Sequence, residues 1–137
     1  MEIVYEHRVP YADVDQMSIV YYANYLIYFE HGRNEYLRKI GLPYYDMEKM
    51  GIMLPVLEAH CNYYKSAKYD DLLYIKSELS EINGPRLKMS CQVCLADGTV
   101  LAEGYTWHVS VSIETGKPCR LPQNLKLALE KFVVIKK

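Results

Sequence analysis

The chain has 137 residues, of which 50% are apolar and 24% are charged, a composition typical of a folded globular protein and not of a disordered or fibrous one. Sixteen basic and seventeen acidic residues give a net charge of -1 and are spread along the chain, which argues against nucleic acid as the main partner. We expect one cytoplasmic domain over residues 1–137, because the sequence has neither a leader pattern nor an apolar run long enough to span a membrane.

The first half of the chain predicts a strand followed by a long helix. Apolar and polar residues alternate in the opening segment MEIVYEHRVPY, which indicates a strand that ends at Pro10. From about Tyr22 to Ile40 the spacing changes to three and four residues, which predicts an amphipathic helix. Its apolar positions are Leu26, Phe29, Tyr36, Leu37 and Ile40. Gly41 suits the left-handed position after a helix, and Gly32 within it predicts close approach of a strand beneath.

The second half has the period of strands. A short helical turn is possible at YYDMEKMG, and four long alternating segments follow it: MLPVLEAHCNYYK, LLYIKSELSEI, RLKMSCQVCL and VLAEGYTWHVSVSI. The segments between them, KYDD, NGP and DG, are typical of turns, so we expect a four-stranded antiparallel meander. The last segment, LPQNLKLALEKFVVIKK, is compatible with a short helix or a fraying strand.

This order of elements predicts an α+β fold in which an antiparallel sheet of about five strands wraps around the long helix. Strands of ten or more residues would leave long sheet edges exposed in a monomer. We therefore expect the chain to form a homodimer.

Several kinds of chemistry are disfavoured by the sequence. The four histidines show no metal-ligand spacing, and the chain has no glycine-rich phosphate loop and no nucleophile elbow. The four cysteines are too scattered for a disulfide framework. We therefore expect no metal and no organic cofactor.

The carboxylates of ADVDQMSIVYYAN are the remaining candidates. Asp13 and Asp15 have an ordinary interpretation as loop residues that form Asx turns. The apolar run that follows them favours a second one, in which the loop is buried near the helix start. Free N–H groups there would polarise a carbonyl oxygen, and a carboxylate upstream would attack the carbonyl carbon or activate water.

The stretch YADVDQMSIVYYANYLIYFEHGRNEYLRKIGLPY resembles the opening signature of the hotdog-fold acyl-CoA thioesterases of the 4-hydroxybenzoyl-CoA thioesterase family, including its YbgC-like branch. The resemblance implies hydrolysis of an acyl-CoA at the interface of a homodimer, or of a homotetramer made of two dimers. It assigns the catalytic carboxylate to Asp15 and the N–H that polarises the thioester to Tyr22. Val20, Asn24 and Tyr25 complete the motif as substrate-binding positions, and Asp13 becomes a supporting loop residue.

Other positions carry less specific expectations. Ser18 stands where the family commonly has glycine, and a tyrosine or histidine at position 22 distinguishes its branches. Lys65, Lys68, Arg86 and Lys88 are candidates for the phosphates of coenzyme A, although solvated surface positions explain them equally well. Glu30 either lines the pocket or is an ordinary exposed helix residue.

Two other functions remain open on the sequence. A hotdog hydratase or dehydratase would share the architecture, but it relies on a catalytic histidine at the helix, and no histidine opens this one. A module that binds acyl-CoA or acyl-carrier protein without catalysis would use Asp15 only to shape the loop.

Overall fold

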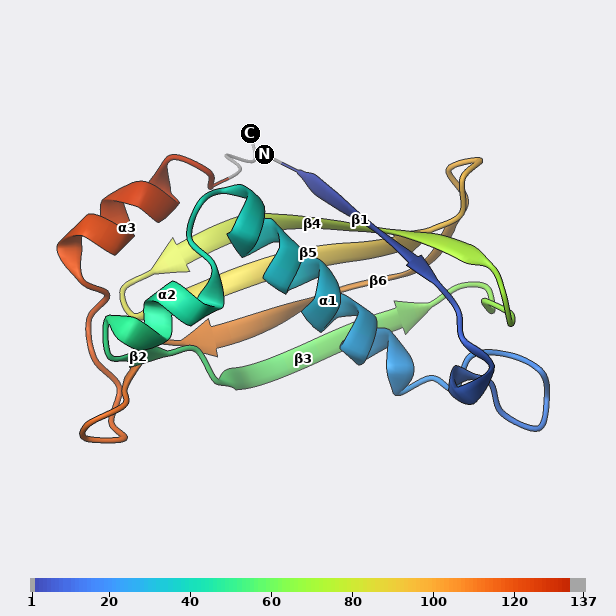
Figure 1. Ribbon diagram of the computed structural model, residues 1–137, viewed down its shortest axis with the longest axis horizontal. Helices are drawn as coiled ribbons and strands as arrows, with labels where there is room; N and C mark the ends of the chain where they lie inside the picture. Colours follow the sequence, from blue (N-terminus) through green and yellow to red (C-terminus); the bar gives the residue numbers. More distant parts are fainter. Residues whose placement is uncertain (1, 134–137) are drawn as a thin grey trace.

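The computed structural model describes residues 2–133, which form an antiparallel sheet with one long helix across its inner face (Figure 1). The sheet order is β1-β4-β5-β6-β3. Its strands are β1 (Ile3–Arg8), β3 (Val56–Tyr63), β4 (Leu72–Asn83), β5 (Arg86–Cys94) and β6 (Val100–Val109). The helices are η1 (Tyr11–Asp13), α1 (Asn24–Lys39), α2 (Tyr44–Lys49) and α3 (Gln123–Glu130), and β2 (Ile52–Met53) pairs with β7 (Val111–Ser112). Helix α1 is the predicted long helix, and the predicted five-stranded α+β arrangement is confirmed.

The predicted four-stranded meander is wrong for one strand. Strands β4, β5 and β6 do pair consecutively, but β3 pairs with β6 at one edge and β1 pairs with β4 near the other. The segment between β3 and β4, which contains KYDD, is therefore a crossover and not a hairpin. It leaves β6 where Tyr64 N donates to Leu101 O (2.8 Å) and reaches the end of β1 where Val9 N donates to Asp71 O (3.0 Å).

The start of α1 explains this crossover. Val20 N donates to Ala67 O at 2.9 Å, and Ala67 N donates to the Tyr25 hydroxyl at 3.0 Å. The middle of the crossover is thus held under the first turn of the helix. Because its two ends bond near opposite edges of the sheet, β3 and β4 do not pair with each other.

Helix α1 buries one face, though not quite the predicted one. Phe29, Tyr36 and Leu37 are buried as expected, whereas Leu26 is 38% exposed. Tyr25 and Tyr28 take the inner face of the first turns instead. Each keeps a hydroxyl hydrogen bond at its polar end, so a tyrosine is stable there despite burial.

Both glycines singled out in the helix segment behave as predicted. Gly41 has φ +83, and Leu42 N donates to Leu37 O at 2.8 Å, which closes the helix end. A Cβ at Gly32 would lie 2.5 Å from Ser77 Oγ and 2.7 Å from Ile75 Cγ2, both on β4. The close approach of a strand beneath the helix is therefore confirmed.

The C-terminal segment is a helix as far as it is described. Leu125 and Leu129 of α3 are buried and belong to one apolar cluster with Tyr36 and Leu37 of α1 and Met47 of α2. Residues 134–137, which belong to the same sequence segment, lie outside the described range. Among the helices in residues 2–133, none is long and apolar enough to cross a membrane.

Candidate active site

The loop between η1 and α1 folds back on itself in a tight turn around Asp15. Asp15 N donates to Ile19 O at 2.9 Å, and Ser18 N donates to Asp15 O at 3.0 Å. Ser18 has φ +65, in the left-handed region that glycine adopts most easily. The serine therefore adopts a conformation suited to the glycine that is common at this position.

The carboxylate of Asp15 is only half engaged. Its Oδ1 accepts a hydrogen bond from Met17 N at 2.8 Å, which fixes the direction of the side chain. Within residues 2–133, its other oxygen has no hydrogen-bond or ion-pair partner. Asp15 also borders a surface hollow of about 240 Å³, which we name the loop hollow. The other residues that line it are Met17, Ile19, Val20, Tyr22, Tyr25, Tyr63, Tyr64, Lys65 and Ser66.

The start of α1 leaves donors open beside this hollow. The helix has no side-chain N-cap, and the amide of Tyr22 donates to no acceptor in the described part of the chain. The carbonyl of Tyr22 accepts a hydrogen bond from the Tyr63 hydroxyl at 3.1 Å, so the backbone is held in place. A free amide at the positive end of a helix dipole is suited to an oxygen that gains negative charge.

Asp13 anchors the loop to the helix. Its Oδ2 accepts a hydrogen bond from the Tyr28 hydroxyl at 2.7 Å, and its carbonyl accepts from Asn24 Nδ2 at 3.0 Å and from Tyr21 N at 2.9 Å. Burial, together with the charge of Asp13, raises the pKa of Tyr28, so the phenol remains a donor. The side chain of Asn24, predicted to contact substrate, is thus engaged in fixing the loop.

The candidate cations fall into two groups. Lys65 lines the loop hollow. Lys68 is close by, because its backbone forms an isolated antiparallel β-bridge with Ile19, which also lines the hollow. Arg86 and Lys88 lie toward the other end of the sheet on the face opposite α1; Arg86 borders a shallow hollow beside Glu58 and Trp107. The Lys88 ammonium lies 4.5 Å from the centre of the Tyr105 ring. A single chain does not bring these two residues to Asp15.

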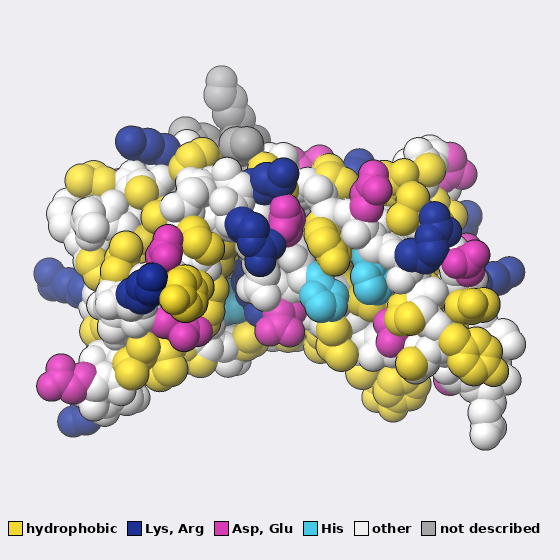
Figure 2. Space-filling model, viewed as in Figure 1, with side chains coloured by type: hydrophobic (Ala, Val, Ile, Leu, Met, Phe, Trp, Pro, Cys, Tyr) yellow, Lys and Arg dark blue, Asp and Glu magenta, His cyan; other side chains and the backbone are white. Residues whose placement is uncertain are grey.

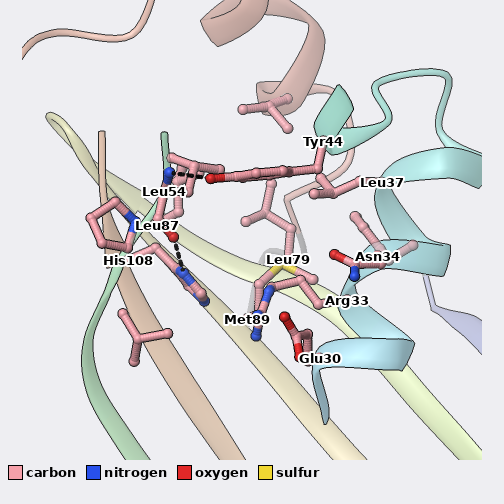
Figure 3. A pocket seen from close by; sticks show the side chains of 14 residues that line it. Glu30, Arg33, Asn34, Leu37, Tyr44, Leu54, Leu79, Leu87, Met89 and His108 are labelled. Atoms are coloured by element: carbon pink, nitrogen blue, oxygen red, sulfur yellow. Dashed lines mark hydrogen bonds between the residues drawn. The ribbon is translucent and has the colours of Figure 1, made fainter. Parts of the chain in front are cut away.

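A second hollow, which the sequence did not predict, lies between the far half of α1 and the sheet (Figure 3). It has a volume of about 310 Å³, and we name it the helix hollow. Glu30, Arg33 and Asn34 of α1 line it, so Glu30 is a pocket residue, as one of its two interpretations held. The rest of the lining is Tyr36, Leu37, Tyr44, Leu54, Pro55, Val56, Leu79, Leu87, Met89, His108 and Leu129.

His108, which lines the helix hollow, is neutral. Its Nδ1 lies 2.9 Å from Leu54 O, a group that can only accept, so Nδ1 carries the proton. Its Nε2 then accepts from the Thr106 hydroxyl at 2.8 Å. Burial lowers the pKa of His108 to about 4, and the charge of Arg33 acts in the same direction.

The Arg33 side chain lines the same hollow and is half-buried. Burial lowers the pKa of its guanidinium, and the charge of Glu30 opposes that shift. No hydrogen bond or ion pair to Arg33 occurs among residues 2–133, so Glu30 is not within 4.0 Å of its nitrogens. Nothing in a helical sequence pattern separates such an arginine from an exposed one, because the hollow depends on the distance between α1 and the sheet edge.

Within residues 2–133, no three His, Cys, Asp or Glu side chains are placed to hold a metal ion together. The chemistry available at the loop hollow is thus that of a carboxylate, a backbone amide and a helix dipole.

Comparison with known proteins places this geometry in a family. Residues 9–129 match the family model described as the thioesterase-like superfamily. A putative acyl-CoA thioesterase of Bacillus subtilis, YneP, is 33% identical over 113 residues, which is 82% of each chain. The acyl-CoA thioesterase YbgC of Haemophilus influenzae is 31% identical over 122 residues, 88% of this chain and 89% of YbgC.

Solved structures of thioesterases have the same fold as this chain. The DHNA-CoA thioesterase of Staphylococcus aureus superposes with a TM-score of 0.90 at 30% identity, over 95% of this chain and 89% of that one. The predicted hotdog fold, the resemblance to YbgC-like thioesterases and the prediction of a thioester hydrolase are confirmed. The chain belongs to the thioesterase-like superfamily.

Proposed function

We propose that this protein hydrolyses acyl-CoA thioesters to a free acid and coenzyme A, and that Asp15 and the Tyr22 amide carry the reaction. The observation that supports this most is their common place in the loop hollow: a carboxylate with one free oxygen and a helix-start amide without an acceptor. The names of the relatives YneP and YbgC support acyl-CoA as the substrate class.

The reaction follows from the two groups. The thioester carbonyl oxygen accepts a hydrogen bond from Tyr22 N, and the helix dipole stabilises the charge that develops on it. Asp15 either attacks the carbonyl carbon or takes a proton from a water that does so. The C–S bond breaks, and coenzyme A leaves as a thiolate that takes up a proton. In the water route the free acid remains; in the nucleophile route the acyl group stays on Asp15 as an anhydride until water hydrolyses it to the free acid. The bond from Met17 N holds one carboxylate oxygen and leaves the other for this step.

The phosphates of coenzyme A require cations near the mouth of the hollow. Lys65 lines the hollow and Lys68 follows it in the crossover, so both are suitably placed in the same chain. Arg86 and Lys88 are too far along the sheet to serve the same Asp15, and they contribute only if a second copy brings them there.

A second copy is part of the proposal. Strand β3 is the edge of the sheet, and Val56, Leu57 and Tyr63 on it are 49%, 51% and 46% exposed. The margin of the molecule along which β3 runs carries hydrophobic side chains and is concave (Figures 1 and 2). Pairing of β3 with β3 of another copy would complete its hydrogen bonds, in a homodimer or in a homotetramer of two such dimers.

The rival functions differ in what the protein releases. A binding module would hold acyl-CoA without forming free thiol, and a hydratase would change the acyl chain and leave the thioester intact. Release of free coenzyme A from acyl-CoA substrates, followed with a thiol reagent, therefore separates the thioesterase from both rivals. We expect thiol release for at least one of short, long and aryl acyl-CoAs; intact thioester in every case would overturn the proposal.

The role of Asp15 is tested by Asp15→Asn. We expect kcat to fall by ~10³-fold or more, because the amide is neither a nucleophile nor a base, while the affinity for acyl-CoA stays similar. Wild-type turnover by the variant would remove Asp15 from the mechanism.

A further inference from the structure

The helix hollow combines apolar walls with one half-buried cation. Leu37, Leu79, Leu87 and Met89 contribute apolar side chains to it, and the Arg33 side chain extends into it (Figure 3). His108 adds no charge, because burial keeps it neutral and both its nitrogens are already hydrogen-bonded. Arg33 is thus the one cation in the lining.

The Arg33 guanidinium is partly shielded from solvent, and no other group in the described part of the chain pairs with it. It carries no hydrogen bond within residues 2–133, and the carboxylate of Glu30, which is exposed to screening water, lies beyond ion-pair distance. Leaving a charge partly buried and unpaired is costly, and a carboxylate that accepts two N–H bonds from arginine offsets that cost well. The Asn34 side chain, also without a hydrogen bond in the described range, lies next to it and offers further donors.

The two hollows are far apart within one chain. They share no lining residue, and they border opposite ends of β3: Val56 lines the helix hollow and Tyr63 lines the loop hollow. Val56 and Tyr63 are seven residue steps apart along the strand, which is about 23 Å. The acyl group of a thioester held at Asp15 therefore has no short route to Arg33 of the same chain.

The proposed dimer changes this relation. When two antiparallel β3 strands pair around their common midpoint, Val56 of one copy lies opposite Tyr63 of the other. Each loop hollow is then next to the helix hollow of the other copy. Both hollows lie on the face of the sheet that carries α1, so the acyl group can pass from one to the other without crossing the sheet.

We propose that Arg33 of one copy binds a carboxylate at the far end of the acyl group whose thioester is held at Asp15 of the other copy. The preferred substrates are then acyl-CoAs of dicarboxylic acids, with an apolar chain between the thioester and the free carboxylate. This inference rests on the proposed thioesterase function and adds to it the substrate class and the residue that selects it.

The selectivity is tested with two substrates of equal length, octanoyl-CoA and the mono-CoA thioester of octanedioic acid. We expect the ratio of kcat/KM for the dicarboxylic over the plain substrate to be above one and to fall by about 30-fold in Arg33→Met. Because both values come from one preparation, partial loss of folded protein cancels in the ratio. Arg33→Lys should keep part of the preference.

Arg38→Met is the matched control for that ratio. Arg38 lies on the same helix but is exposed and paired with Glu35, so its loss removes the same charge without touching the hollow. An unchanged ratio in Arg33→Met, or an equal fall in Arg38→Met, would overturn the inference.

The contribution from the second copy is tested with purified mixed dimers of an Asp15→Asn chain and an Arg33→Met chain. If Arg33 acts across the dimer, one of the two sites keeps both wild-type residues, and turnover of the dicarboxylic substrate returns to about half the wild-type value. If Arg33 acts within its own chain, no site is complete and turnover stays near that of Arg33→Met. Wild-type activity of Asp15→Asn alone would instead refute the proposed catalytic role, so the two failures are distinguishable.

Discussion

The loop hollow and the helix hollow lie at opposite ends of α1 and are lined by different kinds of groups. The loop hollow, about 240 Å³, is formed by the tight turn and helix start between Asp15 and Tyr25 together with residues 63–66, with a carboxylate and backbone groups at its surface. The helix hollow, about 310 Å³, is formed by side chains from distant segments, with an arginine among leucines. Under the proposed function, the polar groups that carry the chemistry lie at one end of the helix, and the apolar volume that recognises the acyl group lies at the other.

The electrostatic character of the two ends differs as well. At the loop hollow, Asp15 is partly exposed and close to water. At the helix hollow, burial lowers the pKa of His108 and of Arg33, so charge is disfavoured there. Acid should therefore damage the helix hollow through a group that has no counterpart in the loop.

The largest effect expected from this difference is the response of stability to acid. His108 has a folded-state pKa of about 4 against 6.5 for the ordinary side chain, so between these values the unfolded chain binds a proton that the folded chain does not. The free energy of unfolding should fall as the pH is lowered through this window, by about 3 kcal/mol in total. Urea denaturation at pH 7 and near pH 4 measures it.

His108→Asn isolates this contribution from the titration of carboxylates. The asparagine amide can still donate to Leu54 O but takes up no proton, so the variant should lose about 3 kcal/mol less than wild type over the same range. Equal pH dependence in the two proteins would show that His108 is not held neutral in the helix hollow.

A second, smaller effect tests the packing between the two ends. Gly32→Ala improves helix propensity by about 1 kcal/mol, but its methyl group would lie 2.5 Å from Ser77 Oγ and 2.7 Å from Ile75 Cγ2. Overpacking of that kind costs up to about 3 kcal/mol, so we expect a net loss of about 2 kcal/mol. Thermal unfolding is the measurement.

Lys39→Ala, at the exposed end of the same helix, is the control for Gly32→Ala. It should change the free energy of unfolding by less than about 0.5 kcal/mol. A Gly32→Ala protein as stable as wild type would mean that α1 does not rest on β4 as closely as the structure has it.

The smallest effect concerns the loop hollow. Tyr28→Phe removes the hydroxyl that donates to Asp13 Oδ2 at 2.7 Å and so loosens the loop that carries Asp15. We expect kcat to fall by about tenfold and stability by about 1 kcal/mol. Tyr105→Phe, which removes a hydroxyl hydrogen-bonded to Glu58 on the outer face of the sheet, should leave kcat within about twofold. Equal kcat values for the two variants would show that the hydrogen bond between Tyr28 and Asp13 does not position the loop for catalysis.

The residues of the loop hollow can be predicted from the sequence much better than those of the helix hollow. Asp15, Ser18 and Tyr22 lie within eight positions and are governed by local turn and helix-start geometry, so a motif contains them. Arg33 and His108 come together only through tertiary packing of α1 against the sheet. No local pattern encodes that distance.

The errors in the predicted fold have the same origin. The turn residues of KYDD are correctly located, but local chemistry does not specify whether a turn joins neighbouring strands or opposite edges. Likewise, Leu26 has the more apolar side chain, but Tyr25 occupies the inner face because Ala67 N offers its hydroxyl a hydrogen bond. Both outcomes depend on the crossover under α1.

The most direct test of the account compares kcat for acyl-CoA hydrolysis in Asp15→Asn and Asp97→Asn. Asp97 lies in the exposed turn between β5 and β6, where its Oδ1 accepts from Thr99 N. It does not line the loop hollow, so its replacement removes the same charge outside that hollow. The account predicts a loss of at least ~10³-fold for Asp15→Asn and wild-type kcat for Asp97→Asn. Wild-type kcat in the Asp15 variant would contradict it.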